Sequence, residues 1–282
     1  MEINKVLVIG SGQMGSGIAQ VLAQAGYEVV LNDIKQEFVE RGLNNITKQL
    51  TRLVEKGRVT EADKEQYLAN ITTSVSYDDA KDVDLVIEAA TENREIKLNI
   101  FKQLSELVKE DAILATNTSS LSITEIATVT NRPHKVIGLH FFNPVPVMKL
   151  IELNIGLTTD RETVEAMKTL SERLGKTAIE VKDAPGFAVN RILIPMINEA
   201  IFVLSEGIST VEEIDEAMKL GANHPMGPLA LADYIGLDTV QAIMNVLYDG
   251  YKDPKYRPCH LLRKYVEAGK LGRKSGAGFY NY

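Results

Sequence analysis

The 282-residue sequence has no tryptophan, a single cysteine, four histidines and no long apolar run. The lone Cys259 excludes an intrachain disulfide framework and is typical of a reducing compartment. No apolar run approaches the roughly 20 residues of a bilayer-spanning helix, so we expect no membrane partner. An apolar strand pattern begins within the first residues, which predicts a cytoplasmic protein without a signal peptide. The histidines lack the spacing to cysteine or carboxylates that marks a metal site, and we expect none.

Basic residues are also fewer than acidic ones, with 31 lysines and arginines against 38 aspartates and glutamates. The formal net charge of −7 argues against nucleic acid as a general partner. Any anionic ligand must therefore be met by a local group of basic side chains. The apolar content of 45% and charged content of 24% are ordinary for a soluble globular protein. The length allows two domains of about 100–200 residues each.

The N-terminal segment has the order strand, glycine-rich turn, helix, strand. Residues 5–9 are a buried-strand run, residues 16–23 indicate a helix, and residues 27–31 indicate a second strand. In a dinucleotide-binding turn the glycines allow a tight turn, a close pyrophosphate and close helix packing, in that order. An ordinary tight turn is the alternative, but the elements have the order that the binding motif requires. The candidate cofactor-binding residues of the turn are Gly10, Gly12, Gln13, Met14 and Gly15.

The second strand ends at Asn32 and Asp33, and Asp33 is a candidate contact for the adenine ribose. Its carboxylate would accept hydrogen bonds from the ribose hydroxyls and repel a 2′-phosphate. NAD is therefore favoured over NADP as the cofactor. Lys35 lies close enough to soften that repulsion, so some use of NADP stays open.

Further strands at residues 84–90 and 112–117 alternate with helical patterns. This alternation predicts a doubly wound sheet, whose ligand crevice lies at the carboxyl ends of its strands. Polar side chains follow both strands, namely Glu92, Asn93, Lys97, Asn117, Thr118, Ser119 and Ser120. Ser119 or Ser120 could instead cap a helix that begins near Ile123, and both interpretations stay open.

A long polar helical region between Phe38 and Leu68 exceeds what a minimal dinucleotide-binding unit needs. Lys48, Arg52 and Lys56 recur within it at i, i+4 and i+8, which places them on one helix face. Such a stripe would bind a phosphate-bearing substrate. A solvated face balanced by neighbouring glutamates is the alternative.

Two apolar runs, residues 136–142 and 147–153, flank a segment that contains Pro146, a strand–turn–strand pattern. If the strands pair about this turn, His140 falls opposite Glu152. A carboxylate beside an imidazole fixes its tautomer and makes the histidine a usable base. A buried histidine that is merely satisfied by the carboxylate is the alternative.

Helical patterns dominate after residues 181–186, which predicts domains at 1–184 and 185–282. Pro195 lies inside the first C-terminal helical pattern and predicts a kink or break. Residues 196–204 are apolar around most of the helix, which favours burial at a subunit interface. Asn190 is either a ligand contact or a surface residue.

Several of these segments match a known family over nearly the whole chain: GSGQMGSGIAQ, VIEAATEN, NTSSLSITEIA, GLHFFNPVPVMKLIEL, APGFAVNRIL, ANHPMGPLALADYIGLD and GRKSGAGFY. The sequence closely resembles the 3-hydroxyacyl-CoA dehydrogenase family, most nearly its bacterial 3-hydroxybutyryl-CoA members. The resemblance implies a Rossmann-like NAD-binding domain, an all-helical C-terminal domain and a homodimer formed through the C-terminal helices. It implies reversible oxidation of (S)-3-hydroxybutyryl-CoA to acetoacetyl-CoA; a longer-chain enzyme or a non-enzymatic dinucleotide-binding protein is the alternative.

The resemblance also implies roles for individual residues, and the sequence departs from the family at no proposed catalytic position. His140 becomes the catalytic base, Glu152 its orienting partner, and Ser119 and Asn190 contacts of the reacting oxygen. The nicotinamide half of NAD would be lined by Glu92, Lys97, Asn117 and Lys274. The phosphates of an acyl-CoA substrate would be bound by Lys48, Arg52 and Lys56, with Lys56 as the leading candidate.

Overall fold

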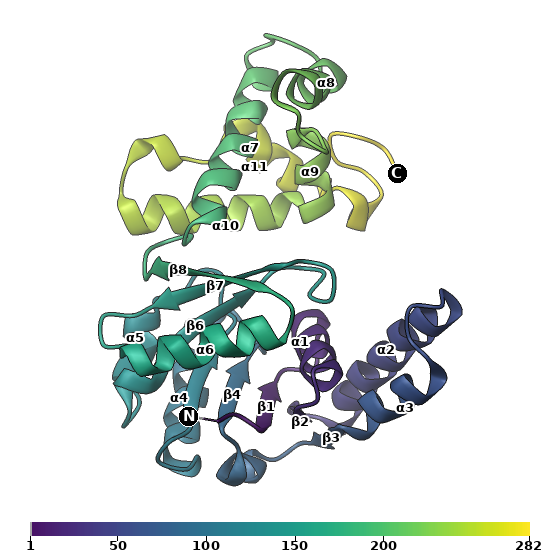
Figure 1. The fold of residues 1–282 in the computed structure, drawn as a ribbon. Coiled ribbons are helices and arrows are strands. Elements are labelled where there is room, and N and C mark those ends of the chain that lie inside the picture. The colour runs from purple at the N-terminus through teal and green to yellow at the C-terminus, as the bar shows by residue number, and fades with distance from the viewer. Residues whose placement is uncertain (1) are drawn as a thin grey trace. The chain divides into compact units, whose positions relative to one another are not determined.

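A computed structural model describes residues 2–282, which form two compact units that divide between Asp183 and Ala184 (Figure 1). The division falls one residue before the boundary expected from the sequence. No helix within the described residues combines the length and apolarity needed to cross a membrane. The predicted α/β fold with a helical C-terminal domain is confirmed.

The N-terminal unit is built on one eight-stranded sheet, in the order β3-β2-β1-β4-β5-β6-β7-β8. All neighbouring strands are parallel except β6 and β7, which are antiparallel. The strand order reverses between β1 and β4, the position where doubly wound sheets bind ligands. The strands are β1 Lys5–Ile9, β2 Glu28–Asn32, β3 Ile71–Ser74, β4 Leu85–Glu88, β5 Ile113–Thr116, β6 Val136–Phe141, β7 Leu150–Ile155 and β8 Thr177–Lys182.

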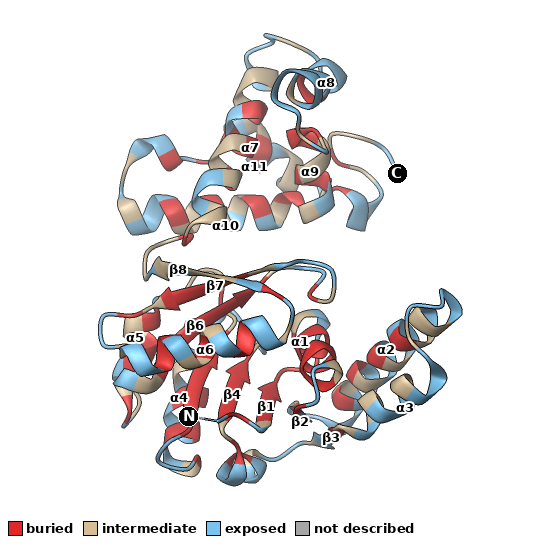
Figure 2. Ribbon diagram, viewed as in Figure 1, coloured by how far each residue is buried: buried red, intermediate tan, exposed pale blue. Residues whose placement is uncertain are grey.

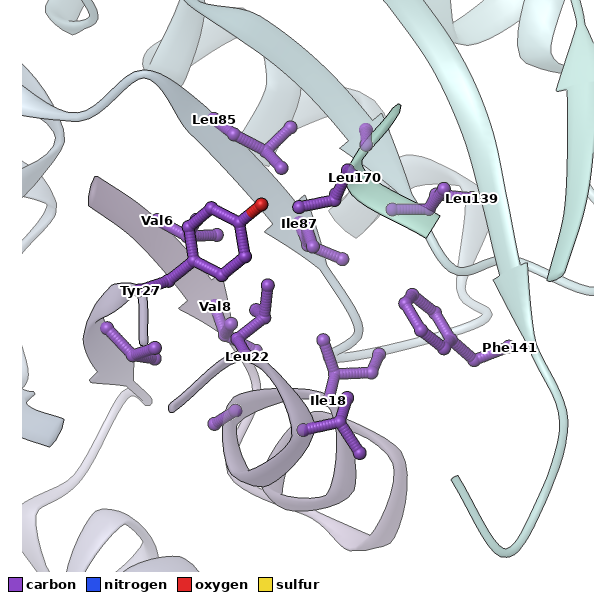
Figure 3. Packing of buried hydrophobic residues seen from close by; sticks show 14 of the residues in the cluster. Val6, Val8, Ile18, Leu22, Tyr27, Leu85, Ile87, Leu139, Phe141 and Leu170 are labelled. Carbon is purple, nitrogen blue, oxygen red and sulfur yellow. The ribbon is translucent and has the colours of Figure 1, made fainter. Parts of the chain in front are cut away.

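Helices cover both faces of this sheet: α1 Gln13–Gln24, α2 Gln36–Glu55, α3 Glu61–Ala69, α4 Arg94–Leu107, α5 Ile123–Thr128 and α6 Arg161–Arg173. Figure 2 shows the central strands almost uniformly buried between them. On one face, Ile18 and Leu22 of α1 and Leu170 of α6 pack on side chains of β1, β4 and β6 (Figure 3). Successive side chains of a strand alternate between faces. Leu139 and Phe141 therefore join this core, while His140 faces the side of α5.

The polar helical region predicted between Phe38 and Leu68 is two helices, α2 and α3, joined by a turn. Thr60 ends this turn and caps α3 in a reciprocal capping box with Asp63. The buried side chains of α2 lie along one face and include Val39, Ile46 and Leu50. The opposite face of α2 stays polar, so its basic residues are accessible.

The C-terminal unit consists of α7 Val189–Ser205, α8 Val211–Ala222, α9 Pro228–Ile235, α10 Leu237–Tyr251 and α11 His260–Glu267. Its core gathers Ile197 and Ile201 of α7 with Leu229 of α9 and Met244 of α10. Helix α7 continues through Pro195, so of the predicted kink or break the break is wrong, and the kink stays a prediction. A proline removes one helical hydrogen bond. Burial of the neighbouring Ile194 and Ile197 favours the helix on either side of that gap.

Candidate active site

The three glycines of the first turn differ in what their missing side chains permit. Gly10 has φ +95°, and a Cβ there would lie 2.6 Å from the Cα of Ala90. A Cβ on Gly15 would lie 1.7 Å from the carbonyl oxygen of Gly10. By contrast, a Cβ on Gly12 would meet nothing within 4 Å. The protein's own packing therefore requires Gly10 and Gly15, whereas Gly12 leaves open space at the N-terminus of α1.

A cavity of about 460 Å³ lies beside this turn, at the carboxyl ends of β1, β2 and β4. Asp33 lines it and accepts hydrogen bonds from the backbone N–H (2.7 Å) and hydroxyl (2.8 Å) of Ser11. Burial raises the pKa of the Tyr77 hydroxyl in the same lining, with the negative charges of Glu88 and Asp33 adding to the effect. The apolar part of the lining is formed by Ile34, Phe38, Ile96 and Ile100. This lining offers a carboxylate for sugar hydroxyls and flat apolar surface for a base.

A second cavity of about 390 Å³ lies between the glycine-rich turn and α2. One wall contains Ser11, Gly12, Gln13 and Ser16. The other wall is a face of α2 with three basic side chains, Arg41, Lys48 and Arg52. Lys56 follows the last residue of α2 and is exposed outside this lining. Lys48 and Arg52 of the predicted stripe thus face the glycine-rich turn. Arg41, which was not predicted, lies on the same wall of the cavity.

Lys97 and Glu88 form a buried ion pair at the carboxyl end of β4. The Lys97 ammonium also donates to Thr116 (3.2 Å), while Glu88 accepts from the backbone N–H of Ala90 (2.9 Å). Lys97 was predicted to line the nicotinamide half of the cofactor. The structure buries its ammonium between Glu88 and Thr116, at the ends of β4 and β5, and the direct contact with the cofactor stays a prediction.

Glu92 organises the loop that follows β5. It accepts hydrogen bonds from the backbone N–H (2.7 Å) and hydroxyl (3.0 Å) of Ser119, and it also binds the hydroxyl of Thr118. The cap of α5 is Ser122, whose hydroxyl accepts from the N–H of Glu125. Capping therefore does not explain Ser119, because a later serine fills that position.

The predicted hairpin places His140 of β6 opposite Glu152 of β7. The imidazole Nδ1 lies 2.8 Å from a carboxylate oxygen of Glu152, which is fully buried. An ionised carboxylate here holds the proton on Nδ1. The ring of Phe142 lies 4.5 Å from the imidazole, centroid to centroid, and limits its rotation. The predicted register is confirmed, although β7 begins at Leu150, later than expected.

Two side-chain hydrogen bonds tie this hairpin to the cofactor half of the sheet. The Asn117 side-chain oxygen accepts from the backbone N–H of Phe141 (2.8 Å). The Gln13 amide donates to the side-chain oxygen of Asn143 (3.0 Å), which links the glycine-rich turn to the turn after β6. The strand of His140, the loop of Ser119 and the glycine-rich turn therefore form one connected framework within the N-terminal unit.

Two predicted site residues belong to the C-terminal unit. Asn190 is half-buried in the first turn of α7. Lys274 is exposed and forms a hydrogen bond of 2.6 Å with Asp238. Their contacts with substrate and cofactor stay predictions. The described residues 2–282 contain no cluster of three or more side chains suited to a metal ion.

Two family models together match almost the entire chain. Residues 5–184 match the 3-hydroxyacyl-CoA dehydrogenase NAD binding domain, and residues 186–282 match the C-terminal domain of the same family. The chain belongs to the 3-hydroxyacyl-CoA dehydrogenase family.

Individual members of the family are similar over their full lengths. The 3-hydroxybutyryl-CoA dehydrogenase of Clostridioides difficile is 55% identical over 278 residues, covering 99% of each chain. That of Bradyrhizobium diazoefficiens is 55% identical over 280 residues, covering 99% of this chain and 96% of the relative. The crystal structure of (S)-3-hydroxybutyryl-CoA dehydrogenase PaaH1 from Ralstonia eutropha superposes with a TM-score of 0.97. It is 56% identical and covers 100% of this chain and 99% of its own.

As a 3-hydroxyacyl-CoA dehydrogenase, the protein is an oxidoreductase with NAD as its cofactor. The described residues fit that cofactor. Gly12 leaves room for a pyrophosphate at the N-terminus of α1, where no side chain caps the helix. Asp33 and the apolar lining of the 460 Å³ cavity suit an adenosine.

Sequence reasoning missed Arg41, Ser11 and Tyr77 as parts of these linings. For Arg41 a signal was present, since Arg41, Asn45, Lys48 and Arg52 follow the spacing of one helix face. Nothing in the sequence marks Ser11 or Tyr77 in this way.

Proposed function

We propose that this 3-hydroxyacyl-CoA dehydrogenase interconverts (S)-3-hydroxybutyryl-CoA and acetoacetyl-CoA, with His140 as general acid and base. The observation that carries the proposal is the buried pair of His140 and Glu152, 2.8 Å apart and connected to the glycine-rich turn. The four-carbon substrate is supported by the names of relatives that are 55% identical over nearly the whole chain. The S configuration is supported by the name of the Ralstonia enzyme.

The proposed chemistry transfers a hydride to or from the cofactor and a proton to or from His140. NAD, when bound, exchanges the hydride with C3 of the substrate. In the oxidative direction the imidazole Nε2 of His140 accepts the proton of the 3-hydroxyl group. In the reductive direction the imidazolium returns this proton to the oxygen of the former ketone. Glu152 keeps Nδ1 protonated and stabilises the positive charge that His140 acquires.

Ser119 and Asn190 would stabilise the reacting oxygen. Negative charge accumulates on that oxygen during reduction, and hydrogen-bond donors aimed at it lower the barrier. In the structure the Ser119 hydroxyl lies 3.0 Å from Glu92. A serine hydroxyl rotates about its Cβ–Oγ bond, so its proton can turn from Glu92 to a substrate oxygen.

Replacing Asp33 with serine is expected to raise the ratio of kcat/KM for NADPH over NADH at least about tenfold. Hydrogen bonds to a charged partner contribute about 1.5–3 kcal/mol, which NADH loses. NADPH no longer meets a carboxylate, and Arg41 already lines the same cavity. Initial rates with both cofactors measure this ratio. The control Glu37→Gln removes an exposed charge outside the lining, and an unchanged ratio in the Asp33 variant would refute the ribose contact.

We further propose that Lys48 and Arg52 bind the nucleotide phosphates of coenzyme A, because both line the second cavity. Lys56, the leading candidate from the sequence, lies outside that lining and stays a third candidate. Replacing Lys48 and Arg52 together with alanine is expected to raise KM for acetoacetyl-CoA about tenfold. KM for acetoacetyl-pantetheine should stay unchanged, because this substrate lacks the nucleotide phosphates. Lys102→Ala, an exposed lysine of α4, is the control. Equal effects on both substrates would contradict the assignment.

The direct test of the function is oxidation of NADH by the purified chain in the presence of acetoacetyl-CoA. We expect turnover that is highest with the four-carbon substrate and falls with longer 3-ketoacyl-CoA substrates. A preference for long acyl chains would make the protein a longer-chain dehydrogenase. Binding of NADH without turnover of any 3-ketoacyl-CoA would reject the proposal.

Homodimerisation and a cytoplasmic location are part of the same proposal. The apolar side chains of Phe202, Val203 and Leu204 on α7 are only half-buried in the single chain. A second copy would cover such a surface. The single cysteine is compatible with a reducing compartment.

A further inference from the structure

Lys176 is a buried cation with an unusual set of partners. The residue lies in the short link between the end of α6 and the start of β8 and is 7% exposed. The ammonium donates to the backbone carbonyl oxygens of Val145 and Met148, both at 2.6 Å. No carboxylate of the described residues forms an ion pair with it, whereas the other buried lysine, Lys97, is paired with Glu88.

Such an arrangement is costly, because an ammonium loses its hydration on burial and here gains no opposite charge. Burial and the nearby positive charge of Lys149 accordingly lower the pKa of Lys176. A neutral, apolar residue would avoid this cost but could not bind the two carbonyl groups. What lysine provides at this position, and an apolar residue cannot, is therefore the pair of hydrogen bonds to those carbonyls.

The two carbonyl groups belong to the turn that joins the strands of His140 and Glu152. This turn, residues 142–149, follows β6 and precedes β7. Its other side meets the cofactor half of the sheet. Asn143 accepts from Gln13 (3.0 Å), and Val145 packs so closely on α1 that a Cβ on Gly17 would lie 2.9 Å from it. The turn is thus held between the first turns of α1 and Lys176.

Lys176 itself is anchored by its backbone. Its N–H donates to the carbonyl oxygen of Ser171 at the end of α6 (3.0 Å). The N–H of Thr177 donates to the carbonyl oxygen of Lys149, where β8 begins to pair with β7 (2.7 Å). Because its backbone is fixed at this junction, the Lys176 side chain can hold the carbonyl groups that it binds in a defined position.

We propose that Lys176 is a positioning residue for the dehydrogenase reaction. Its ammonium binds the carbonyl groups of Val145 and Met148 and so holds the turn in place. The position of the turn sets the distance between His140 and the N-terminus of α1 that the reaction requires. It acts through the turn and does not touch substrate or cofactor. This inference rests on the proposed function of His140. Under it, a residue that lines neither cavity affects the rate of the dehydrogenase reaction.

The test compares Lys176→Met, Lys176→Gln and Lys176→Arg with the wild-type protein. Methionine keeps most of the stem and removes the donors, glutamine keeps a neutral donor, and arginine keeps donors and charge. We expect kcat for acetoacetyl-CoA reduction to fall about 10–100-fold in Lys176→Met, the loss typical of a misplacement near 1 Å. KM for acetoacetyl-CoA should change less than threefold, and Lys176→Arg should restore most of kcat. Lys182→Met, an exposed lysine at the far end of β8, is the matched control.

A purely structural role would lower the melting temperature but leave kcat per folded molecule unchanged. Rates are therefore measured well below the melting temperature and normalised to the folded fraction. Hydrogen exchange at the amides of Val147 and Met148, which both donate to the Pro144 carbonyl, reports on the turn directly. Faster exchange together with lower kcat supports the proposal, and wild-type kcat in Lys176→Met overturns it. If the methionine variant does not fold, Lys176→Gln takes its place. The glutamine nitrogen lies one bond nearer the backbone than the lysine nitrogen and cannot reach both carbonyl oxygens, so wild-type kcat and exchange in this variant overturn the proposal as well.

Failure of the proposed function is seen separately. A wild-type protein that does not reduce acetoacetyl-CoA rejects the substrate assignment before any variant is made. The affinity for NADH and the exchange of the turn amides then still report on Lys176. We expect Lys176→Met to weaken NADH binding severalfold, because the contact between Asn143 and Gln13 loosens; unchanged affinity and exchange would reject the positioning role.

Discussion

Replacing His140 with glutamine is expected to lower the turnover of acetoacetyl-CoA at least about a hundredfold, with the fold and NADH affinity retained. General acid–base groups contribute about 10²–10⁴ in rate, and glutamine can form hydrogen bonds but cannot exchange a proton at neutral pH. Its amide can donate to Glu152, so the buried carboxylate does not lose its partner. Steady-state rates, circular dichroism and NADH titration measure the three properties.

Two further variants sharpen this experiment. His134→Gln alters an exposed histidine on the same unit and should leave the rate unchanged. Glu152→Gln should also reduce turnover, because the neutral amide no longer stabilises the imidazolium. Near-normal turnover in His140→Gln would show that the pair of His140 and Glu152 is structural and that another group carries the proton.

Replacing Gly12 with valine is expected to weaken NADH binding at least about a hundredfold while the protein keeps its stability. A side chain at Gly12 meets no protein atom within 4 Å, so the folded chain tolerates it. It does occupy the space through which a pyrophosphate reaches the backbone N–H groups of α1. The loss of two or more such bonds, each worth about 1.5–3 kcal/mol, accounts for the reduction.

Gly15→Ala provides the opposite result and serves as the comparison. Its Cβ would lie 1.7 Å from the carbonyl oxygen of Gly10, which forces the turn and α1 apart. We expect this variant to melt at a lower temperature even without cofactor. Thermal melts with and without NADH separate the two effects. Normal NADH affinity in Gly12→Val would place the pyrophosphate elsewhere.

Local sequence signals predicted much of the site. The glycine spacing, the run of residues 5–9 and the terminal Asp33 are all consecutive in the chain, so one supersecondary unit explains them together. The hairpin was equally predictable, because strand side chains have a period of two and a known turn position fixes which residues lie opposite. His140 and Glu152 needed no further information.

Other features depend on packing between distant segments and could not be predicted. The buried pair of Lys97 and Glu88 requires α4 to place its lysine under the end of β4. The role of Arg41 depends on which face α2 turns to the glycine-rich turn, and this is decided by its packing on α1. Polar residues such as Lys176 resemble ordinary surface residues until the neighbouring elements are in place.

The antiparallel pairing of β7 with β6 limits how the segment between His140 and Glu152 can change in length. His140 and Glu152 come from strands that run in opposite directions on either side of a short turn. An insertion or deletion of one residue in that turn would shift the register by one and rotate every β7 side chain to the other face. Ile151 or Leu153 would then lie opposite His140, and the carboxylate would enter the apolar core. The length of the turn therefore fixes the pairing of His140 with Glu152 as firmly as the two residues do, and a change of length there removes the pairing at once.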